Sequence, residues 1–317
     1  MKFRSILMSS LLICLTAGCG GSSAAMRFGT SEKGGGYHQL GTEIVDILLE
    51  NGIIAEGEAV ETAGSAANIT MMSEGKLKLA LAQADILYDA YNGERMFNNA
   101  FSVKGYQAIA GIYPETVHII IGRNSDIRSL DDLRGKTISV GVSESGTEQD
   151  AFCILNAAGL QPTDVTTVNM KTSEAAEALK SGEIDVLFST SGVPNPSVLE
   201  LFESGTARFL PIGTEMISSI CDQYEYFFPY RIDSSGYPNM ETDYDGIAVR
   251  SVLICSESLP ADTVQQITEA LFENTERVEQ CIPVRFVLQE ETAVKDIPIP
   301  FHPGAVKYYE TKGIQVR

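Results

Sequence analysis

Three short turns rich in glycine, serine and threonine carry the residue types best suited to holding a small ligand. They lie at residues 34–37, 64–68 and 143–147, and each separates an apolar run from the start of a helical pattern. Backbone N–H groups at a helix N-terminus have no partner within the helix, and the helix dipole adds positive charge there. Glycine allows a ligand to approach this backbone closely. Each turn alone is also typical of an ordinary strand-to-helix connection, but the three together predict a pocket for a small anion such as a carboxylate.

The elements around these turns are predicted to be alternating strands and helices. A strand at residues 27–30 leads through the first turn into a helix that ends near Gly52, and the third turn leads into a helix that ends at Gly159. This order is typical of an α/β fold with largely parallel sheets and helices on both faces. Further strands are predicted at residues 53–60, 77–81, 106–113, 117–121, 137–142, 208–212 and 247–255.

Two helix–strand units resemble one another. Residues 65–81 combine a capped helix, a glycine and an alternating strand, and Gln83 follows them. Residues 173–188 repeat this order, and Ser191 and Gly192 follow. Ligands of open α/β sheets bind at the carboxyl ends of the strands. The repeat therefore predicts two lobes whose polar strand ends face each other across a cleft.

The overall composition restricts the class of partner. The chain has 317 residues, of which 44% are hydrophobic, and a formal net charge of −19. So acidic a chain is not expected to bind nucleic acid or an anionic lipid surface. An anionic ligand must then be held by local donors against an unfavourable overall field.

The cysteines and histidines do not form a metal-binding pattern. Cys153, Cys221, Cys255 and Cys281 have no close spacing, and the three histidines are scattered. We therefore expect no metal site and no cofactor. One or two disulfides are compatible with an exported chain, although Cys153 and Cys255 lie in apolar runs and are expected to be buried thiols.

The N-terminus is typical of a targeting segment. An apolar run at residues 6–15 is too short to span a bilayer, and small residues then lead to Cys19 and a Gly/Ser stretch. We expect a lipoprotein signal peptide at residues 1–19, lipidation of Cys19 and a flexible tether at residues 20–25. The protein would be extracytoplasmic and anchored to the cell membrane, in the periplasm if the host has an outer membrane. The alternative is a plain secretory signal cut near Ala24 or Ala25.

Catalytic motifs are incomplete in this chain. Residues 135–137 resemble the end of a phosphate-binding loop, but Leu130 stands where its first glycine is needed. Residues 141–145 lack the final glycine of a nucleophile elbow. We therefore do not expect an enzyme.

Several short motifs, in their order and spacing, resemble those of the TAXI-type solute receptors of TRAP transporters. The resemblance covers nearly the whole chain after the targeting segment. The matching runs are Gly29-Thr30 with the following glycines and Tyr37, and residues 64–68, 82–85, 88–93, 113–115, 132–136, 145–148, 191–194 and 301–305.

The resemblance implies a two-lobe periplasmic-binding-protein fold of the class II type, a clamshell with the ligand cleft between its lobes. Residues 26–115 and 246–317 would form one lobe and residues 116–245 the other. It implies a monomeric receptor that captures a small organic acid or amino acid, such as glutamate, glutamine or a related dicarboxylate. The receptor would deliver this solute to the membrane subunits of a sodium-driven TRAP permease. Presentation of the solute to a membrane sensor kinase is the alternative, and a hydrolase is a weaker one.

The resemblance also implies the residues that hold the ligand. Ser65 and Asn68 would donate to one ligand carboxylate, although both residue types are also common helix caps. Ser145, Thr147 and the backbone N–H of Gly146 would hold a second carboxylate from the other lobe. The remaining candidates are Thr30, Gly36, Tyr37 over the alkyl part of the ligand, Gln83 and Glu115 for an amino or hydroxyl group, and Ser191 with Gly192; Glu115 is alternatively a hinge residue.

Overall fold

The computed structural model describes residues 25–98, 102–143 and 145–316. The predicted signal peptide, with Cys19, and the tether up to residue 24 lie outside the described residues. Within the described residues, no helix has the length and apolar character that crossing a bilayer requires.

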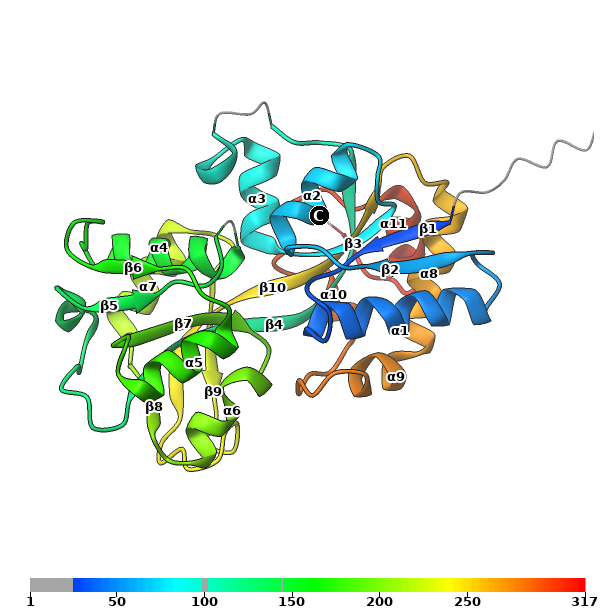
Figure 1. The fold of residues 1–317 in the computed structure, drawn as a ribbon. Coiled ribbons are helices and arrows are strands. Elements are labelled where there is room, and N and C mark those ends of the chain that lie inside the picture. Colours follow the sequence, from blue (N-terminus) through cyan, green and yellow to red (C-terminus); the bar gives the residue numbers. More distant parts are fainter. Residues whose placement is uncertain (1–24, 99–101, 144, 317) are drawn as a thin grey trace, which may run out of the picture.

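One mixed β-sheet runs through both halves of the molecule, and two long strands connect them (Figure 1). β4 (Tyr106–Gly122) and β10 (Tyr244–Ser256) pair with each other in antiparallel fashion along most of their length. The other strands lie at the two ends of this central pair. At one end are β1 (Met26–Gly29), β2 (Gly57–Val60) and β3 (Leu79–Gln83), of which β3 pairs with β10. At the other end are β5 (Thr137–Ser139), β6 (Thr166–Val168), β7 (Val186–Ser191), β8 (Ala207–Phe209) and β9 (Phe228–Ile232), of which β7 and β8 pair with β4 and β9 pairs with β10.

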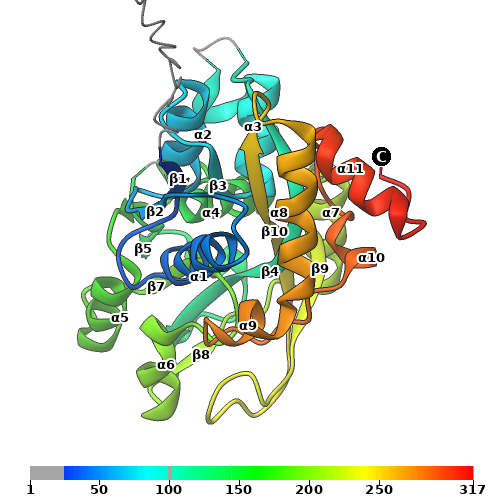
Figure 2. The same cartoon turned by 90° about the vertical axis from the view of Figure 1, so that its right-hand side faces the viewer.

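The helices divide into two groups around these strands, which we call the first lobe and the second lobe (Figure 1). In Figure 2 the first lobe faces the viewer. The first lobe holds β1–β3 and the second holds β5–β9. First-lobe helices are α1 (Gly36–Glu50), α2 (Ser65–Ser73), α3 (Ala84–Asn92), the 3₁₀ turn η1 (Arg95–Phe97), α8 (Ala261–Glu273), α9 (Thr275–Gln280), α10 (Glu290–Ala293) and α11 (Pro303–Thr311). Second-lobe helices are η2 (Leu130–Leu133), α4 (Gly146–Ala157), α5 (Thr172–Ser181), α6 (Pro196–Glu203) and α7 (Thr214–Gln223).

The predicted parallel pairing is confirmed within each lobe and is wrong for the two connecting strands. β1 pairs in parallel with β2 and β3, and β5 pairs in parallel with β6 and β7. β4 and β10 instead run antiparallel to every strand they contact. An antiparallel central pair carries the chain from the first lobe to the second and back, which a purely parallel sheet does not do.

The prediction of two strands at residues 106–113 and 117–121 is also wrong, because β4 is continuous through Pro114. Proline has no N–H to donate to the ladder, and strands tolerate it at irregularities. Pro114 lies opposite Arg250, where the register between β4 and β10 shifts before Val252. Pro114, which predicts a strand break from sequence, thus marks a bulge within a continuous β4.

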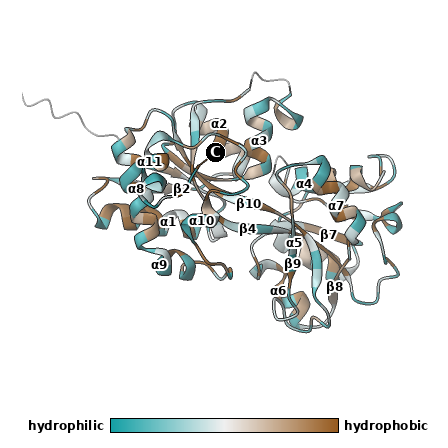
Figure 3. Ribbon diagram, turned by 180° about the vertical axis from the view of Figure 1, so that it is seen from behind, coloured by the Kyte–Doolittle hydropathy of each residue, from teal (hydrophilic) through white to brown (hydrophobic). Residues whose placement is uncertain are grey.

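Each lobe is held together by apolar side chains on its strands and on the inner faces of its helices. Phe28 and Leu40 are fully buried in the first lobe, as are Val198 and Leu187 in the second. Figure 3 shows hydrophobic residues on strands such as β7 and β8, with more hydrophilic stretches on outer helices and loops. The helical amphipathicity that predicted these faces therefore corresponds to packing against the sheet.

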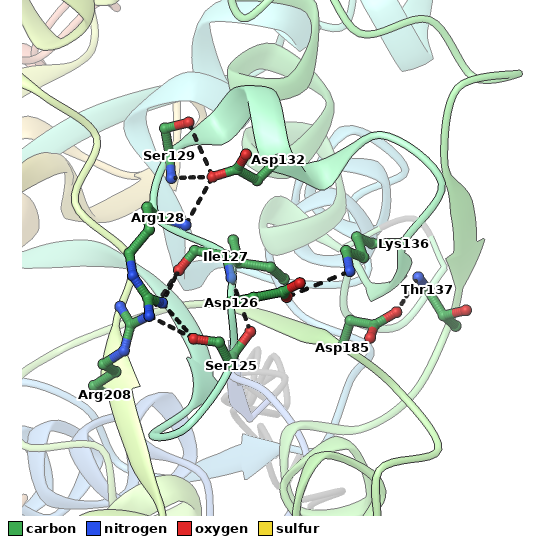
Figure 4. A network of polar contacts seen from close by, with 10 residues as sticks. All are labelled: Ser125, Asp126, Ile127, Arg128, Ser129, Asp132, Lys136, Thr137, Asp185 and Arg208. Atoms are coloured by element: carbon green, nitrogen blue, oxygen red, sulfur yellow. Dashed lines mark hydrogen bonds and ion pairs between the residues drawn. The ribbon is translucent and has the colours of Figure 1, made fainter.

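The loop after β4 is fixed by arginine side chains that bind backbone carbonyls (Figure 4). Arg208 Nη2 donates to the Ile127 carbonyl at 2.7 Å, and Arg128 Nη1 donates to the same oxygen at 2.9 Å. The Asp132 carboxylate accepts from the N–H groups of Arg128 at 2.8 Å and Ser129 at 3.0 Å. These arginines are thus occupied in holding the loop of the second lobe.

The four cysteines of the described residues are all free thiols. Cys153 and Cys255 are buried, which confirms the prediction from their apolar sequence surroundings. Cys221 and Cys281 are half-buried.

Candidate functional site

A cavity of about 290 Å³ lies between the two lobes. Its lining includes the first residue of several helices from both lobes, namely Gly36 of α1, Ser65 of α2, Gly146 of α4, Thr172 of α5 and Pro196 of α6. The N–H groups of a first helical turn have no intrahelical partner, and they carry the positive end of the helix dipole. Helix starts from both lobes therefore bring backbone donors to the cavity, except at Pro196, which has no N–H.

Most of the predicted site residues meet at this cavity although they are far apart in the sequence. Thr30 and Asn68 are the exceptions, because both are fully buried and neither lines the cavity. The predicted residues that do line it are Gly36, Tyr37, Ser65, Gln83, Glu115, Ser145, Gly146, Thr147, Ser191 and Gly192.

Asn68 has an internal role that the prediction of a ligand contact missed. Its side-chain amide donates to the Thr30 carbonyl at 2.7 Å and to the Leu81 carbonyl at 2.8 Å. Its carbonyl oxygen accepts from the Thr62 hydroxyl at 2.8 Å. Both amide hydrogens and the oxygen are thus occupied, so Asn68 ties α2 to the ends of β1 and β3 and offers nothing to a ligand.

Thr30 is likewise corrected from a ligand contact to a structural residue. Its hydroxyl donates to the Val60 carbonyl at 2.7 Å, which fixes the end of β2 beside β1. The side chain is completely buried.

Two hydroxyl groups perform matching tasks in the two lobes. Ser65 Oγ accepts the N–H of Gln83 at 3.1 Å, and Thr147 Oγ1 accepts the N–H of Thr190 at 3.0 Å. Each bond fastens a helix N-terminus to the end of the neighbouring strand. A hydroxyl that accepts one bond still has its own hydrogen to donate, so both groups can also donate into the cavity.

Glu115 is the buried acid of the cavity, on the strand that connects the lobes. Its carboxyl accepts from the Tyr37 hydroxyl at 3.0 Å and also from the Tyr113 hydroxyl. Burial raises the pKa of Glu115 to about 8, and the two tyrosine hydrogen bonds oppose this shift. Near neutral pH the group can therefore hold a proton, and it can accept from a donor on a ligand.

No lysine or arginine lines this cavity within the described residues. Two arginines considered from the sequence as possible carboxylate clamps are engaged elsewhere: Arg123 pairs with Glu241, and Arg231 Nε pairs with Asp245 at 2.6 Å. At the cavity edge, Lys171 of the second lobe pairs with Glu32 of the first at 3.1 Å, and both side chains are exposed. Recognition of an anion here depends on backbone and hydroxyl donors instead of a formal positive charge.

The lobes touch beside the cavity at Gly146. A Cβ atom built on Gly146 would lie 1.6 Å from Oε1 of Gln83, so only a glycine fits while Gln83 keeps this position. On another side of the cavity, the N–H of Arg285 donates to the Val193 carbonyl at 2.8 Å. Contacts between the lobes therefore flank the cavity.

Sequence reasoning missed part of the lining. An available signal was Asn195-Pro196, since asparagine is a strong N-cap and proline is favoured at the first helical position. Asn195 Oδ1 accepts the Ser197 N–H at 2.9 Å at the start of α6. Tyr113, Thr172, Thr190 and residues 282–284 carry no comparable local signal, because the tertiary fold alone brings them to the cavity.

A two-lobe α/β molecule with paired connecting strands and a cavity between its lobes has the fold of periplasmic binding proteins, which confirms the predicted fold class. The chain belongs to the NMT1-like family, whose family model matches residues 28–313. This family assignment agrees with the predicted class of receptor at a coarser level than the TAXI type.

Solved structures share this fold at low sequence identity. The periplasmic aliphatic sulphonate binding protein SsuA from Escherichia coli matches with a TM-score of 0.50 and 14% identity over 90% of this chain and 82% of its own. XAC2383 from Xanthomonas citri, solved bound to ATP, matches with a TM-score of 0.54 and 11% identity over 91% and 95%. A TctC solute binding protein from Polaromonas matches with a TM-score of 0.50 and 15% identity over 81% and 86%.

Proposed function

We propose that this protein is an extracytoplasmic solute receptor that binds a small carboxylate in the cavity between its lobes. The observation that carries the proposal is the convergence of helix N-termini from both lobes on a cavity without a lining lysine or arginine among the described residues. Such N-termini bind anions through backbone N–H groups and the helix dipole. A cavity of about 290 Å³ suits a small metabolite.

The proposed ligand class is glutamate, glutamine or a related dicarboxylate. Its carboxylates would lie against the N-termini of α1 and α2 in the first lobe and of α4 in the second. An amino group on the ligand would donate to Glu115, which otherwise has only tyrosine hydroxyls as described partners. The sequence resemblance to TAXI receptors supports this class independently of the geometry.

Binding would close the two lobes about the strands that connect them. The proposed lobe boundaries are residues 26–115 with 246–317, and residues 116–245. The register shift near Pro114 and Arg250 supports a bend at this level of β4 and β10. Closure would exclude water and complete the ligand contacts from both sides.

The proposed partner of the closed receptor is a TRAP-type permease, and the proposed anchor is a lipid on Cys19. Uptake of radiolabelled solute by host cells with and without this gene tests the transport role. Loss of sodium-dependent uptake, restored by the wild-type gene, is expected. Unchanged uptake with a lost transcriptional response to the solute would instead identify a sensing receptor.

Ligand binding itself is tested by thermal shift with residues 20–317 and L-glutamate, L-glutamine, succinate and glutarate. A ligand that binds only the folded state raises the melting temperature by mass action. We expect a concentration-dependent rise with at least one of these solutes. A melting temperature that no solute changes would contradict the proposed ligand class.

A further inference from the structure

A cluster of acidic side chains is buried where α3 of the first lobe meets α4 of the second. Asp85 lies in the first turn of α3 and Asp150 lies on α4, and neither side chain is exposed to solvent. The charge of Asp85 contributes to raising the pKa of Asp150, and Gln83, two residues before Asp85, places its Nε2 3.5 Å from Asp150 Oδ2. Two ionised carboxylates are both acceptors, so a hydrogen bond between these acids requires a proton on one of them.

The neighbours of this pair do not supply enough positive charge to keep every acid ionised. Among the described residues, Arg95 is the guanidinium in contact with the cluster, and its Nε donates to Asp89 at 2.5 Å. Its Nη2 is 3.9 Å from Asp85 Oδ2, beyond hydrogen-bond distance. The titratable and charged groups that face the pair are Asp89 of α3, Arg95 of η1, Glu115 of β4, Cys153 of α4 and Tyr226 before β9.

Within the part of the chain that the structure describes, several carboxyl oxygens of Asp85 and Asp150 also lack a hydrogen-bond donor. Asp150 Oδ2 accepts from the Thr190 hydroxyl at 2.7 Å and is 3.5 Å from Gln83 Nε2. Asp150 Oδ1 and both oxygens of Asp85 have no hydrogen-bond partner of ordinary geometry among the described residues. Buried polar atoms without partners are unfavourable, and a shared proton would satisfy one oxygen on each side.

We propose that Asp85 and Asp150 share one proton across the interface between the lobes, and that closure of the lobes takes up this proton. In the closed form a carboxylic acid on one lobe donates to a carboxylate on the other. On opening, both groups enter water, both ionise, and the proton passes to solvent. The inference goes beyond the proposed function, because it concerns the lobes alone and holds for any ligand.

The direction of the pH dependence follows from this exchange. Burial raises the pKa of Asp85 to about 7 and the pKa of Asp150 well above its ordinary value. A solvated aspartate in the open form has a pKa of about 4. The closing equilibrium therefore falls by about tenfold for each pH unit between about 4 and about 7, and the proton-linked contribution is lost as the pH rises through about 7.

The shared proton is tested by ¹³C NMR titration of aspartate carboxyl groups in residues 20–317 without added solute. We expect one aspartate resonance to titrate near pH 7 in the wild type and to be absent in both D85N and D150N. An amide can donate in place of the acid, so both variants are expected to fold. Absence of such a resonance in the wild type, or its persistence in either variant, would overturn the proposal.

The effect on closure is tested by small-angle X-ray scattering of the same proteins at about pH 5 and about pH 8. The radius of gyration is expected to increase with pH in the wild type and to stay at its low-pH value in D150N. D46N is the matched control, because it makes the same substitution at an aspartate that is exposed on α1, and it should keep the wild-type response. A wild-type radius that does not change, or a response lost in D46N and kept in D150N, would contradict the assignment.

Discussion

In both lobes a hydroxyl group at a helix N-terminus bonds to the end of a neighbouring strand, but the buried side chain three residues later differs between the lobes. Ser65 in the first lobe and Thr147 in the second each accept an N–H from the end of a neighbouring strand. Three residues later stands Asn68 in the first lobe and Asp150 in the second, and both are fully buried. Asn68 satisfies all of its hydrogen-bonding atoms within its own lobe, whereas Asp150 faces Asp85 of the other lobe and its Oδ1 has no hydrogen-bond partner among the described residues.

The hydrogen bonds of Asn68 do not depend on pH, whereas those of Asp150 depend on its protonation state. An amide carries donors and an acceptor, so Asn68 can bridge two carbonyls and a hydroxyl at any pH. Burial of a carboxyl group is unfavourable unless the group is protonated or paired with a cation. The first-lobe turn is therefore completed within its own lobe, and under the proposed proton exchange the second-lobe turn is completed only when the lobes are together.

The largest expected effect comes from filling the cavity at the first-lobe turn. A Cβ on Gly36 would lie 3.5 Å from the Tyr113 hydroxyl, so the position accepts a side chain that then extends among the cavity-lining residues. We expect G36L to reduce solute affinity by about 100-fold or more, measured by isothermal titration. G122L is the matched control, because Gly122 has open space and does not line the cavity. Equal affinity in G36L and G122L would contradict binding of the solute in the cavity.

Exchanging the two buried positions should have opposite effects on stability. N68D places a carboxylate against the carbonyls of Thr30 and Leu81, which Asn68 now satisfies as a donor. We expect a loss of about 3 kcal/mol in the free energy of unfolding near neutral pH, from urea denaturation. D150N supplies a donor toward Asp85 and should leave the stability unchanged or raised. A similar loss in both variants would show that the two positions are equivalent after all.

Glu115 should discriminate between ligands with and without an amino group. E115Q keeps the shape of the side chain and removes its capacity to ionise. We expect it to weaken L-glutamate by about tenfold and glutarate by much less, because only glutamate carries an ammonium group for Glu115. The ratio of the two dissociation constants is the measured quantity. An unchanged ratio would show that Glu115 does not recognise the amino group and would favour a role in the hinge.

The smallest expected effect concerns the exposed pair at the cavity edge. Lys171 and Glu32 join the lobes through side chains that are both exposed to solvent. Exposed ion pairs contribute about 0–1 kcal/mol, and salt screens them. K171A should therefore weaken solute binding by no more than a few-fold, and the difference from wild type should vanish at high salt. A large, salt-independent loss would indicate that Lys171 contacts the ligand.

The sequence predicted the local elements better than their long-range partners. Glycine-rich turns and periodic apolar residues mark α1, α2 and α4, because capping and amphipathicity are local properties. Pro114 predicts a break from the sequence alone, because only its pairing with Arg250 in the structure shows that β4 continues through a bulge. Tyr113 and residues 282–284 reach the cavity through the tertiary fold and leave no local signature.

In the candidate site, too, the sequence predicts the turns but not the direction of single side chains. The turn that carries Asn68 was located from sequence, but the direction of its side chain was not. Serine, threonine and asparagine at a helix start bond equally well to a ligand or to a nearby strand end. The structure assigns Asn68 to the strand ends because both of its donors meet carbonyls.

The most direct test of the account is a crystal structure of residues 20–317 with the solute that gives the largest thermal shift. The account predicts a carboxylate within hydrogen-bond distance of the N–H groups at the start of α1, α2 or α4, in the cavity between the lobes. A second hollow in the second lobe is lined by Arg123 and Arg208, but Arg123 pairs with Glu241 and Arg208 binds backbone carbonyls, so we expect no solute there. Solute bound at these arginines, with the cavity between the lobes empty, would contradict the central claim.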